Sequence, residues 1–423
     1  MIAFRRWMPV GGCFLLGTML AGSASAVGAG KALRQFITPV ENQKMLACAL
    51  RIKTAVDSRN SRAINACLYL PMWFSKVTAG LPLSKAQRRA MYAQFQLHLG
   101  LGKTLAYQMR HGGRFTLLGV RKIDGQNRAV FRLMLPSGGV SYSEWILVRR
   151  PDGAVVADDI YIAMTGELVS ATSHRMVLFY LAHDEPTLWQ RLTGQASVLV
   201  ANMAQIQQEQ QCVLTRHYHA YLRAWPRLPP ALRRTRMMLQ QQVTVADALA
   251  VANPAKYLRL YRHALRAYRK AFPHDAAPLL MELDYFYTTR QFAKAAAANL
   301  QISKEIGGDP YQVMLAALSE AKLNTPAALL QAQKYADLAI SMRPRYLQTY
   351  WVDISISLKR RNFRQVTRDL LTLHQVLGVA LKPLPGLPAY AGYVRSPEYA
   401  RFLAALHHAG PTTSIATGGT PPH

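Results

Sequence analysis

Carboxylates and tyrosines that could carry acid–base chemistry gather between residues 142 and 161. Paired carboxylates do such work when burial drives their pKa values apart. Asp158 and Asp159 are adjacent in a segment that alternates like a strand, so we expect their side chains to face opposite sides, with only one pointing inward. The alternative interpretation is a strand end with solvated acids and a hydrogen-bonded tyrosine. The candidate pocket residues are Tyr142, Glu144, Asp158, Asp159 and Tyr161.

Basic residues form a second candidate site, on a predicted helix further along the chain. The sequence has 51 Lys and Arg against 22 Asp and Glu, a formal net charge of +29. Such a charge attracts nucleic acid, anionic lipid headgroups and acidic polymers. Spacings of three, four and three residues place four arginines on one helical face, which could follow a polyanion backbone. The alternative is a solvated helix face. The four are Arg259, Arg262, Arg266 and Arg269.

Three cysteines follow the N-terminal apolar segment. Cys48 and Cys67 flank a polar turn between two helical segments, which is compatible with a disulfide that joins them. Two buried small hydrophobic residues would give the same pattern. Cys212 lies near His217 and His219, but two ligands that share a helix face do not make a metal site. We therefore expect no metal ion.

Common catalytic signatures are missing from the sequence. It contains no His-Glu-x-x-His, no Gly-x-Ser-x-Gly and no Cys-x-x-Cys. Gly102-Lys103-Thr104 imitates the end of a phosphate-binding loop, but Leu97 stands where that loop has its first glycine. The sequence therefore predicts no cofactor, no catalytic residue and a non-enzymatic protein.

The N-terminal 26 residues are typical of a secretory signal peptide. Arg5 and Arg6 precede an apolar run, and Ala24-Ser25-Ala26 offers a small-residue cleavage site. This pattern predicts export to the periplasm or outside the cell, with no membrane span left after cleavage; a retained anchor is the alternative. At the other end, residues 410–423 have no apolar pattern, and we expect a disordered tail.

The elements between these ends predict a mainly α protein with an α+β domain near its N-terminus. Residues 31–112 have helical periodicity, and residues 114–172 alternate as four strands separated by Asp-Gly-type turns. Helices packed on a four-stranded antiparallel meander give an α+β domain over 31–190. A helical connector is expected over 191–254. The four strands are Arg114–Ile123, Ala129–Leu135, Ser141–Val148 and Val155–Met164.

The order and lengths of these elements resemble the nuclear-transport-factor and cystatin-like fold. The resemblance covers most of the predicted α+β domain and involves no diagnostic motif. It implies a curled sheet that often encloses a pocket, in which the polar residues of 142–161 would lie. An enzyme with its site around Glu144, Asp158 or Asp159 and Tyr161 is therefore the third functional hypothesis.

Helix boundaries recur with a fixed period in the last third of the chain. Asp309-Pro310 and Arg343-Pro344 mark successive boundaries with a period of about 34 residues. Ala332 and Ala339 fall at small positions of the intervening helix. The pattern resembles tetratricopeptide repeats over about 255–380. The resemblance implies an α–α superhelical array with a concave groove, and residues 255–409 are expected to form the repeats and a C-terminal cap.

Two functional hypotheses follow from these observations besides the enzyme. The leading one is an exported, non-enzymatic adaptor that binds a partner protein in the groove of its repeats. The alternative is an envelope protein that binds polyanions through its basic helix face.

Overall fold

The computed structural model of the chain describes residues 39–408, apart from 82, 137, 185–197, 199, 200, 274 and 382. The predicted signal peptide and tail lie outside the described residues. The chain divides into two compact units, Met1–Met281 and Glu282–His423. Within the described part of the chain, no helix is both long enough and apolar enough to cross a bilayer.

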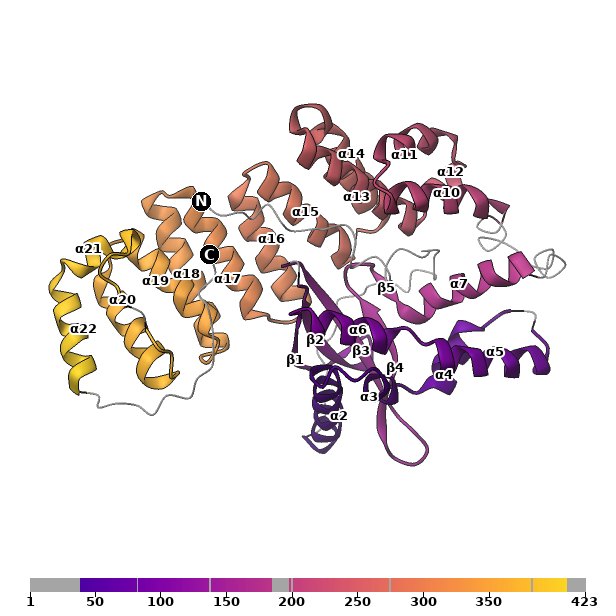
Figure 1. Ribbon diagram of the computed structural model, residues 1–423, viewed down its shortest axis with the longest axis horizontal. Helices are drawn as coiled ribbons and strands as arrows, with labels where there is room; N and C mark the ends of the chain where they lie inside the picture. Colours follow the sequence, from indigo (N-terminus) through magenta and orange to yellow (C-terminus); the bar gives the residue numbers. More distant parts are fainter. Residues whose placement is uncertain are drawn as a thin grey trace. The chain divides into compact units, whose positions relative to one another are not determined.

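The first unit begins with five helices and continues with an antiparallel sheet (Figure 1). The sheet has five strands in sequence order, so the expected number of four is wrong. Gly166, at φ +69°, lets the chain reverse after β4, and two further residues then pair with Tyr161 and Ile162. The helices are α2 (Pro39–Asp57), α3 (Ser61–Ala66), α4 (Leu70–Val77), α5 (Lys85–His98) and α6 (Leu101–Arg110), and the strands are β1 (Arg114–Ile123), β2 (Gln126–Met134), β3 (Val140–Arg149), β4 (Val155–Ile162) and β5 (Glu167–Leu168).

Local sequence signals explain several element ends. Asp124 and Gly125 both have positive φ, 50° and 76°, as a two-residue hairpin turn of the I′ type requires. This turn was expected from the Asp-Gly pair, and the structure confirms it. Ser84 and Gln87 form a capping box that begins α5: each side chain accepts from the other residue's backbone N–H.

One face of the sheet is apolar and packs against α2, α3 and α6. Phe131, Trp145 and Ile160 point into this core and are almost completely buried. Phe115 stacks on Phe131 with ring centroids 4.5 Å apart. The edge of β4 is also covered: Ala157 accepts from Tyr69 N–H (2.6 Å) and donates to the Cys67 carbonyl (3.0 Å). This bridging protects a strand edge that would otherwise invite pairing with another chain.

The described elements of the first unit that follow β5 are all helices. Asn253 and Pro254 separate its last two complete helices: the Asn253 side chain accepts from Lys256 N–H, and Pro254 is the first residue of the next helix. These two helices, α13 and α14, pack side by side. The helices are α7 (Val169–Asp184), α10 (Met203–Leu214), α11 (Tyr218–Ala224), η1 (Trp225–Arg227), α12 (Pro230–Arg233), α13 (Arg236–Ala252) and α14 (Pro254–Ala271).

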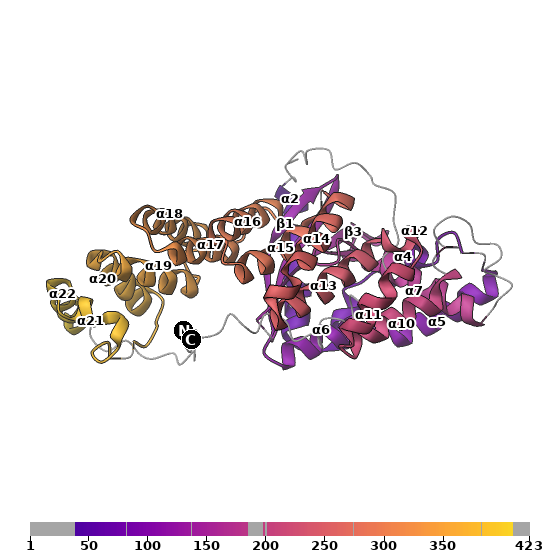
Figure 2. The ribbon, with the colours of Figure 1, turned by 90° about the horizontal axis from the view of Figure 1, so that it is seen from above.

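Within the described residues of the second unit, every regular element is a helix. Each helix from α16 to α20 packs on its successor along the chain (Figure 2). Phe292 and Pro326, the first residues of α16 and α18, are separated by the same interval as Pro310 and Pro344. The elements are α15 (Ala276–Thr288), which contains the division between the units, α16 (Phe292–Glu305), α17 (Pro310–Leu323), α18 (Pro326–Met342), α19 (Leu347–Lys359), α20 (Phe363–Leu371), the π-helical turn η2 (Thr372–Val376), η3 (Pro388–Tyr390), α21 (Ala391–Val394) and α22 (Pro397–His408).

Gly102 lies where α6 approaches α3 most closely. Its N–H donates to Asn65 Oδ1 (3.0 Å), and an added Cβ would stand 2.2 Å from the Ser61 carbonyl oxygen. The glycine of the Gly102-Lys103-Thr104 triplet is therefore explained by helix packing.

We expect Gly102→Ala to lower the free energy of unfolding by about 1–3 kcal/mol, because the new methyl group overlaps the Ser61 carbonyl and the Asn65 side chain. Gly100→Ala is the matched control: a Cβ there meets nothing within 4 Å, so its loss should stay below about 1 kcal/mol. Urea denaturation measures both. Equal losses in the two variants would contradict the packing argument.

Candidate functional site

The second face of the sheet carries a polar layer. Alternation places Arg128, Tyr142, Glu144 and Tyr161 on the face opposite the apolar core, and Glu144 lies directly across from Tyr161 in the β3–β4 register. Asp159 pairs with Ile146 and lies on the same face, so the structure brings four of the five candidate pocket residues onto it.

These residues are engaged with one another inside the protein. Glu144 pairs with Arg128 at 2.6 Å, and Tyr142 is completely buried. Burial first, and then the neighbouring Glu144, raise the pKa of Tyr161 to about 12, against the opposing effect of the Arg236 cation. The Tyr161 phenol therefore stays protonated at neutral pH and cannot act as a base there.

Helix α13 is tied to the same end of the sheet. Arg236 forms an ion pair with Asp275 and lies over the ring of Phe272, 4.1 Å from its centroid. Gln240 Nε2 donates to the Thr165 carbonyl at 2.9 Å and to the Tyr268 hydroxyl at 2.6 Å. The contacts of Gln240 hold α13 against the turn that follows β4 and against α14. Arg236 is engaged inside the protein by Asp275 and Phe272.

The structure corrects the expected orientation of Asp158 and Asp159. Both side chains are buried and both face the same lysine, with Lys76 Nζ 2.9 Å from Asp158 Oδ2 and 3.5 Å from Asp159 Oδ2. The cause is a β-bulge. Ile146 pairs with Asp159 and Leu147 with Ala157, so Asp158 is an extra residue in β4 and the alternation is interrupted there.

Asp159 has a structural task, which is to cap α7. Its carboxylate accepts from Ser170 N–H (3.1 Å), Ser170 Oγ (2.5 Å) and Ile160 N–H (2.9 Å). A carboxylate at a helix N-terminus satisfies orphan donors and opposes the helix dipole. Burial raises the pKa of Asp159, while Ser170 and Lys76 oppose that rise.

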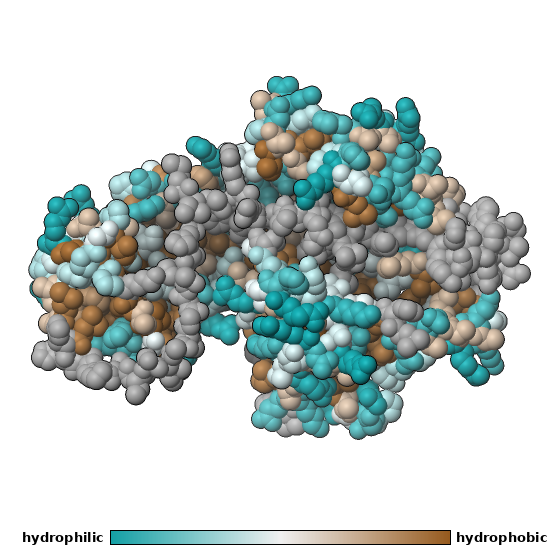
Figure 3. Space-filling view, viewed as in Figure 1, coloured by the Kyte–Doolittle hydropathy of each residue, from teal (hydrophilic) through white to brown (hydrophobic). Residues whose placement is uncertain are grey.

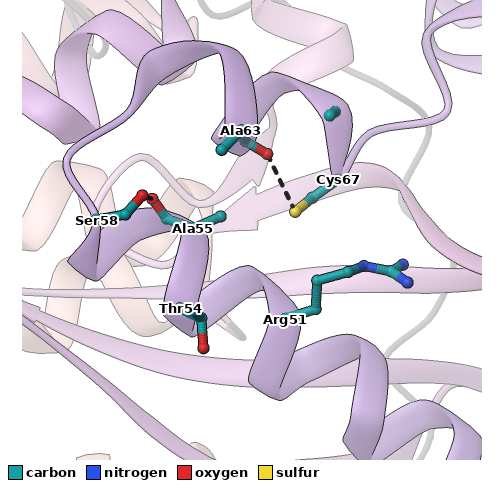
Figure 4. Close-up of a pocket in the computed structure, with 7 residues that line it drawn as sticks. Arg51, Thr54, Ala55, Ser58, Ala63 and Cys67 are labelled. Atoms are coloured by element: carbon teal, nitrogen blue, oxygen red, sulfur yellow. Dashed lines mark hydrogen bonds between the residues drawn. The ribbon is translucent and has the colours of Figure 1, made fainter.

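Cys67 lines a shallow cavity of about 470 Å³ (Figure 4). Cys48 and Cys67 are buried free thiols, so the disulfide proposed from the sequence is not present in this structure. Arg51 Nη2 lies 3.5 Å from Cys48 Sγ, but burial outweighs this cation and raises the pKa of Cys48 to about 11. A thiol with so high a pKa is a poor nucleophile. The cavity is lined by Arg51, Thr54, Ala55, Ser58, Ala63, Ala66 and Cys67.

Helix α14 has two contrasting faces. Tyr261, Ala264, Leu265 and Tyr268 are buried and attach it to the unit. The four predicted arginines all lie exposed, and the 18-residue helix contains no acidic residue. Arg262 and Arg269 also interact within the protein. The exposed cations of α14 are Lys256, Arg259, Arg262, Arg266, Arg269 and Lys270.

The surroundings of this basic face add cations and few acids. Between residues 203 and 271 the sequence has twelve Lys and Arg but only Glu209 and Asp247 as acids. Glu209 is buried, which raises its pKa to about 7, and burial raises the pKa of Asp247 to about 6. Figure 3 shows hydrophilic surface at the outer edges of α11 and α14. The field in front of α14 is therefore positive with little compensation.

The comparisons add no identification. No protein-family model matches the chain, and neither a curated protein nor a solved structure does. Within the described residues, no three His, Cys, Asp or Glu side chains come together in a way that could hold a metal ion.

Sequence reasoning missed Lys76 and Ser170, which complete the aspartate site. Lys76 lies far from Asp159 in the sequence, Ser170 follows Asp159 by 11 residues, and no local pattern marks either of them. It also missed how far the basic face extends, although Lys256 lies three residues before Arg259 and continues the same spacing.

We expect Lys76→Met to lower the free energy of unfolding by about 1–3 kcal/mol at pH 8. This is less than the loss of a partner in a fully buried pair, because the Lys76 side chain is 34% exposed. Without the lysine the Asp159 carboxylate can relieve its burial only by taking up a proton, so the loss should shrink towards pH 5.

Lys53→Met serves as the control, since Lys53 and Asp57 form an exposed i,i+4 pair. It should cost under about 0.5 kcal/mol at either pH. Chemical denaturation at the two pH values decides: a pH-independent loss in Lys76→Met would show that the lysine acts only through packing.

Proposed function

We propose that the first unit binds linear polyanions along the exposed face of α14. The observation that carries the proposal is that cationic and apolar residues lie on different sides of this helix. It has six exposed cations and no acid, and its apolar side is already buried against the rest of the unit. Because the apolar stripe is buried within the unit, α14 is not free to insert into a membrane, and its outer face acts through charge.

The geometry of the helix suits a polymer with regularly spaced charges. Eighteen residues at about 1.5 Å each extend roughly 27 Å. Along this length Arg259, Arg262, Arg266 and Arg269 recur every three or four residues, so neighbouring cations are about 5 Å apart along the axis. A chain of phosphates or uronates can place several negative charges against such a row, and each contact releases a bound counterion.

The buried acids of the helical region strengthen this attraction as pH falls. Glu209 and Asp247 have pKa values raised to about 7 and about 6, so both lose their charge between neutral and mildly acidic pH. The positive charge of residues 203–271 therefore grows by up to two units over that range. Export, as the N-terminal sequence predicts, would expose this face to envelope polyanions.

Substituting Arg259 and Arg266 together by glutamine should weaken the binding of a fluorescent single-stranded oligonucleotide by about tenfold or more at moderate salt. Each phosphate contact that is lost should lower the slope of log K against log salt by roughly 0.7. This pair is chosen because Arg262 and Arg269 also have contacts inside the protein. Fluorescence anisotropy across a salt series measures both quantities.

The matched control removes two exposed arginines from the second unit, by Arg343→Gln and Arg345→Gln. It lowers the net charge of the chain by the same amount, so its affinity should change by less than about threefold. If the two double variants lose affinity equally, net charge alone accounts for binding and the assignment to α14 fails.

A second candidate is the protein-binding adaptor, built on a superhelical repeat array in the second unit. We propose this array because α15 and α17, like α16 and α18, begin one repeat period apart, at the interval that separates Pro310 from Pro344. Ala298, Ala332 and Val366 are buried and recur at the same interval. Tetratricopeptide-like stacking needs this recurrence of small or apolar positions, since neighbouring helices must approach closely there.

The adaptor predicts a partner that stays bound to the mature chain when salt is raised. Cross-linking and purification from the cell envelope, with washes at low and then high salt, should retain one discrete protein whose cross-links map to the repeats. A heterogeneous catch that is lost at high salt would favour the polyanion interface instead.

A further inference from the structure

Two aspartates meet inside the second unit, far along the chain from the basic helix. Asp353 of α19 is fully buried and Asp369 of α20 is 2% exposed. Gln365 Nε2 bridges them, with 2.9 Å to Asp353 Oδ2 and 3.0 Å to Asp369 Oδ1. Gln333 of α18 donates to Asp353 Oδ1. The pair therefore lies where α18, α19 and α20 come together.

The hydrogen bonds indicate which of the two aspartates is ionised and which is protonated. Both oxygens of Asp353 accept, from Gln333 and from Gln365, so Asp353 is suited to be the ionised partner. Asp369 Oδ2 is buried and accepts from no donor among the described residues. A proton on that oxygen turns it into a donor towards Asp353, which satisfies the atom and removes the repulsion of two buried negative charges.

The cations near the pair are directed at other groups. Arg360 Nη1 bonds Gln333 Oε1 at 3.3 Å, and Ser357 Oγ bonds the same oxygen at 3.1 Å, so these groups support the glutamine. Arg368 lowers the pKa of Asp369 slightly. The titratable and charged groups on the elements packed around the pair are Tyr311, Glu320 and Lys322 from α17, Lys334, Tyr335 and Asp337 from α18, Tyr350, Lys359 and Arg360 from α19, Arg364 and Arg368 from α20, His374 from η2, and Glu398, Tyr399 and Arg401 from α22.

Several more of these groups have partners of their own. Lys359 Nζ bonds the Ala321 carbonyl, and His374 Nδ1 lies 3.1 Å from the Val379 carbonyl. Glu398 approaches α20 through its main-chain carbonyl, which accepts from Thr367. A proton is therefore the positive charge best placed to compensate the two carboxylates.

We propose that Asp353 and Asp369 share one proton and that this proton is a pH-sensitive lock on the packing of α20 against α18 and α19. The lock is independent of the polyanion interface, because it lies in the other unit and uses none of its residues. When the proton leaves, two carboxylates repel each other in the core and α20 loosens from the array together with the helix α22 that packs on it.

The direction of the pH dependence follows from the pKa values. Burial first, and then Asp353, raise the pKa of Asp369 to about 9, against an ordinary value of 3.8. The folded unit therefore holds a proton that the unfolded chain has released above about pH 4. This contribution to stability is complete below the unfolded pKa and is lost as pH rises through the folded pKa, at up to about tenfold in the folding equilibrium constant per pH unit.

Hydrogen exchange of the full chain between pH 5 and 9, corrected for intrinsic exchange rates, tests the lock. We expect the protection of α19 and α20 to fall by up to about tenfold per pH unit, and by less elsewhere. Asp369→Asn supplies a permanent amide donor, so its profile should be flat and its protection at pH 8 higher than in the unchanged chain. Asp353→Asn leaves one acceptor oxygen for two glutamine donors, so one donor loses its acceptor, and the variant should lose protection at every pH.

Asp337→Asn is the control, because Asp337 is exposed and accepts only a long bond of 3.3 Å from Gln333. It should follow the unchanged chain. A flat profile in the unchanged chain, or a sloping one in Asp369→Asn, overturns the proposal. If Asp369→Asn fails to fold, the infrared carbonyl stretch of a protonated carboxyl at pH 8.5, where Glu209 and Asp247 are ionised, decides: its presence in the unchanged chain supports the lock, and its absence overturns it.

Discussion

Burial of both faces of one antiparallel sheet is the constraint on which the first unit depends. The first face is apolar and is covered by α2, α3 and α6, whose Ile52, Ile64 and Leu105 share one core with Phe131 and Trp145 of the sheet. The second face is polar, and buried polar groups cost free energy unless each finds a partner. Glu144 finds Arg128, and Gln240 satisfies two backbone carbonyls at the end of β4. Gln240 belongs to α13, a helix distant in sequence from the sheet. The hydrogen bonds that this face requires therefore also determine the position of α13.

The position of α13 in turn determines the direction in which the basic side of α14 faces. Helix α14 packs on α13 through Tyr261, Leu265 and Tyr268, and the Tyr268 hydroxyl accepts from Gln240. Once that stripe is buried, every arginine of α14 must lie on the outer side, because the two sets alternate at helical spacing. Burial of the apolar side of α14 therefore leaves a continuous positive surface on its outer side. The few acids nearby are buried, so they weaken this surface little, and less as pH falls.

Local patterns predicted what depends on local physics. The Asp124-Gly125 turn depends on two adjacent residues, and the grouping of the α14 arginines depends on spacings of three and four residues. The failures involve contacts over longer distances. Whether Asp158 shares a side with Asp159 depends on a bulge opposite another strand, and their lysine comes from a helix far earlier in the chain. The same holds for the fifth strand, which is only two residues long, and for the aspartate pair of α19 and α20.

The central claim, that α14 is a polyanion interface, is tested most directly by locating a bound polymer. A single-stranded oligonucleotide with photoreactive bases, cross-linked to the full chain at moderate salt, reports the contact residues after digestion and peptide mapping. The account predicts cross-links concentrated in α14 and the adjacent α11, and their disappearance when salt is raised. Cross-links spread evenly over the basic residues of both units, or confined to residues 282–408, would contradict it.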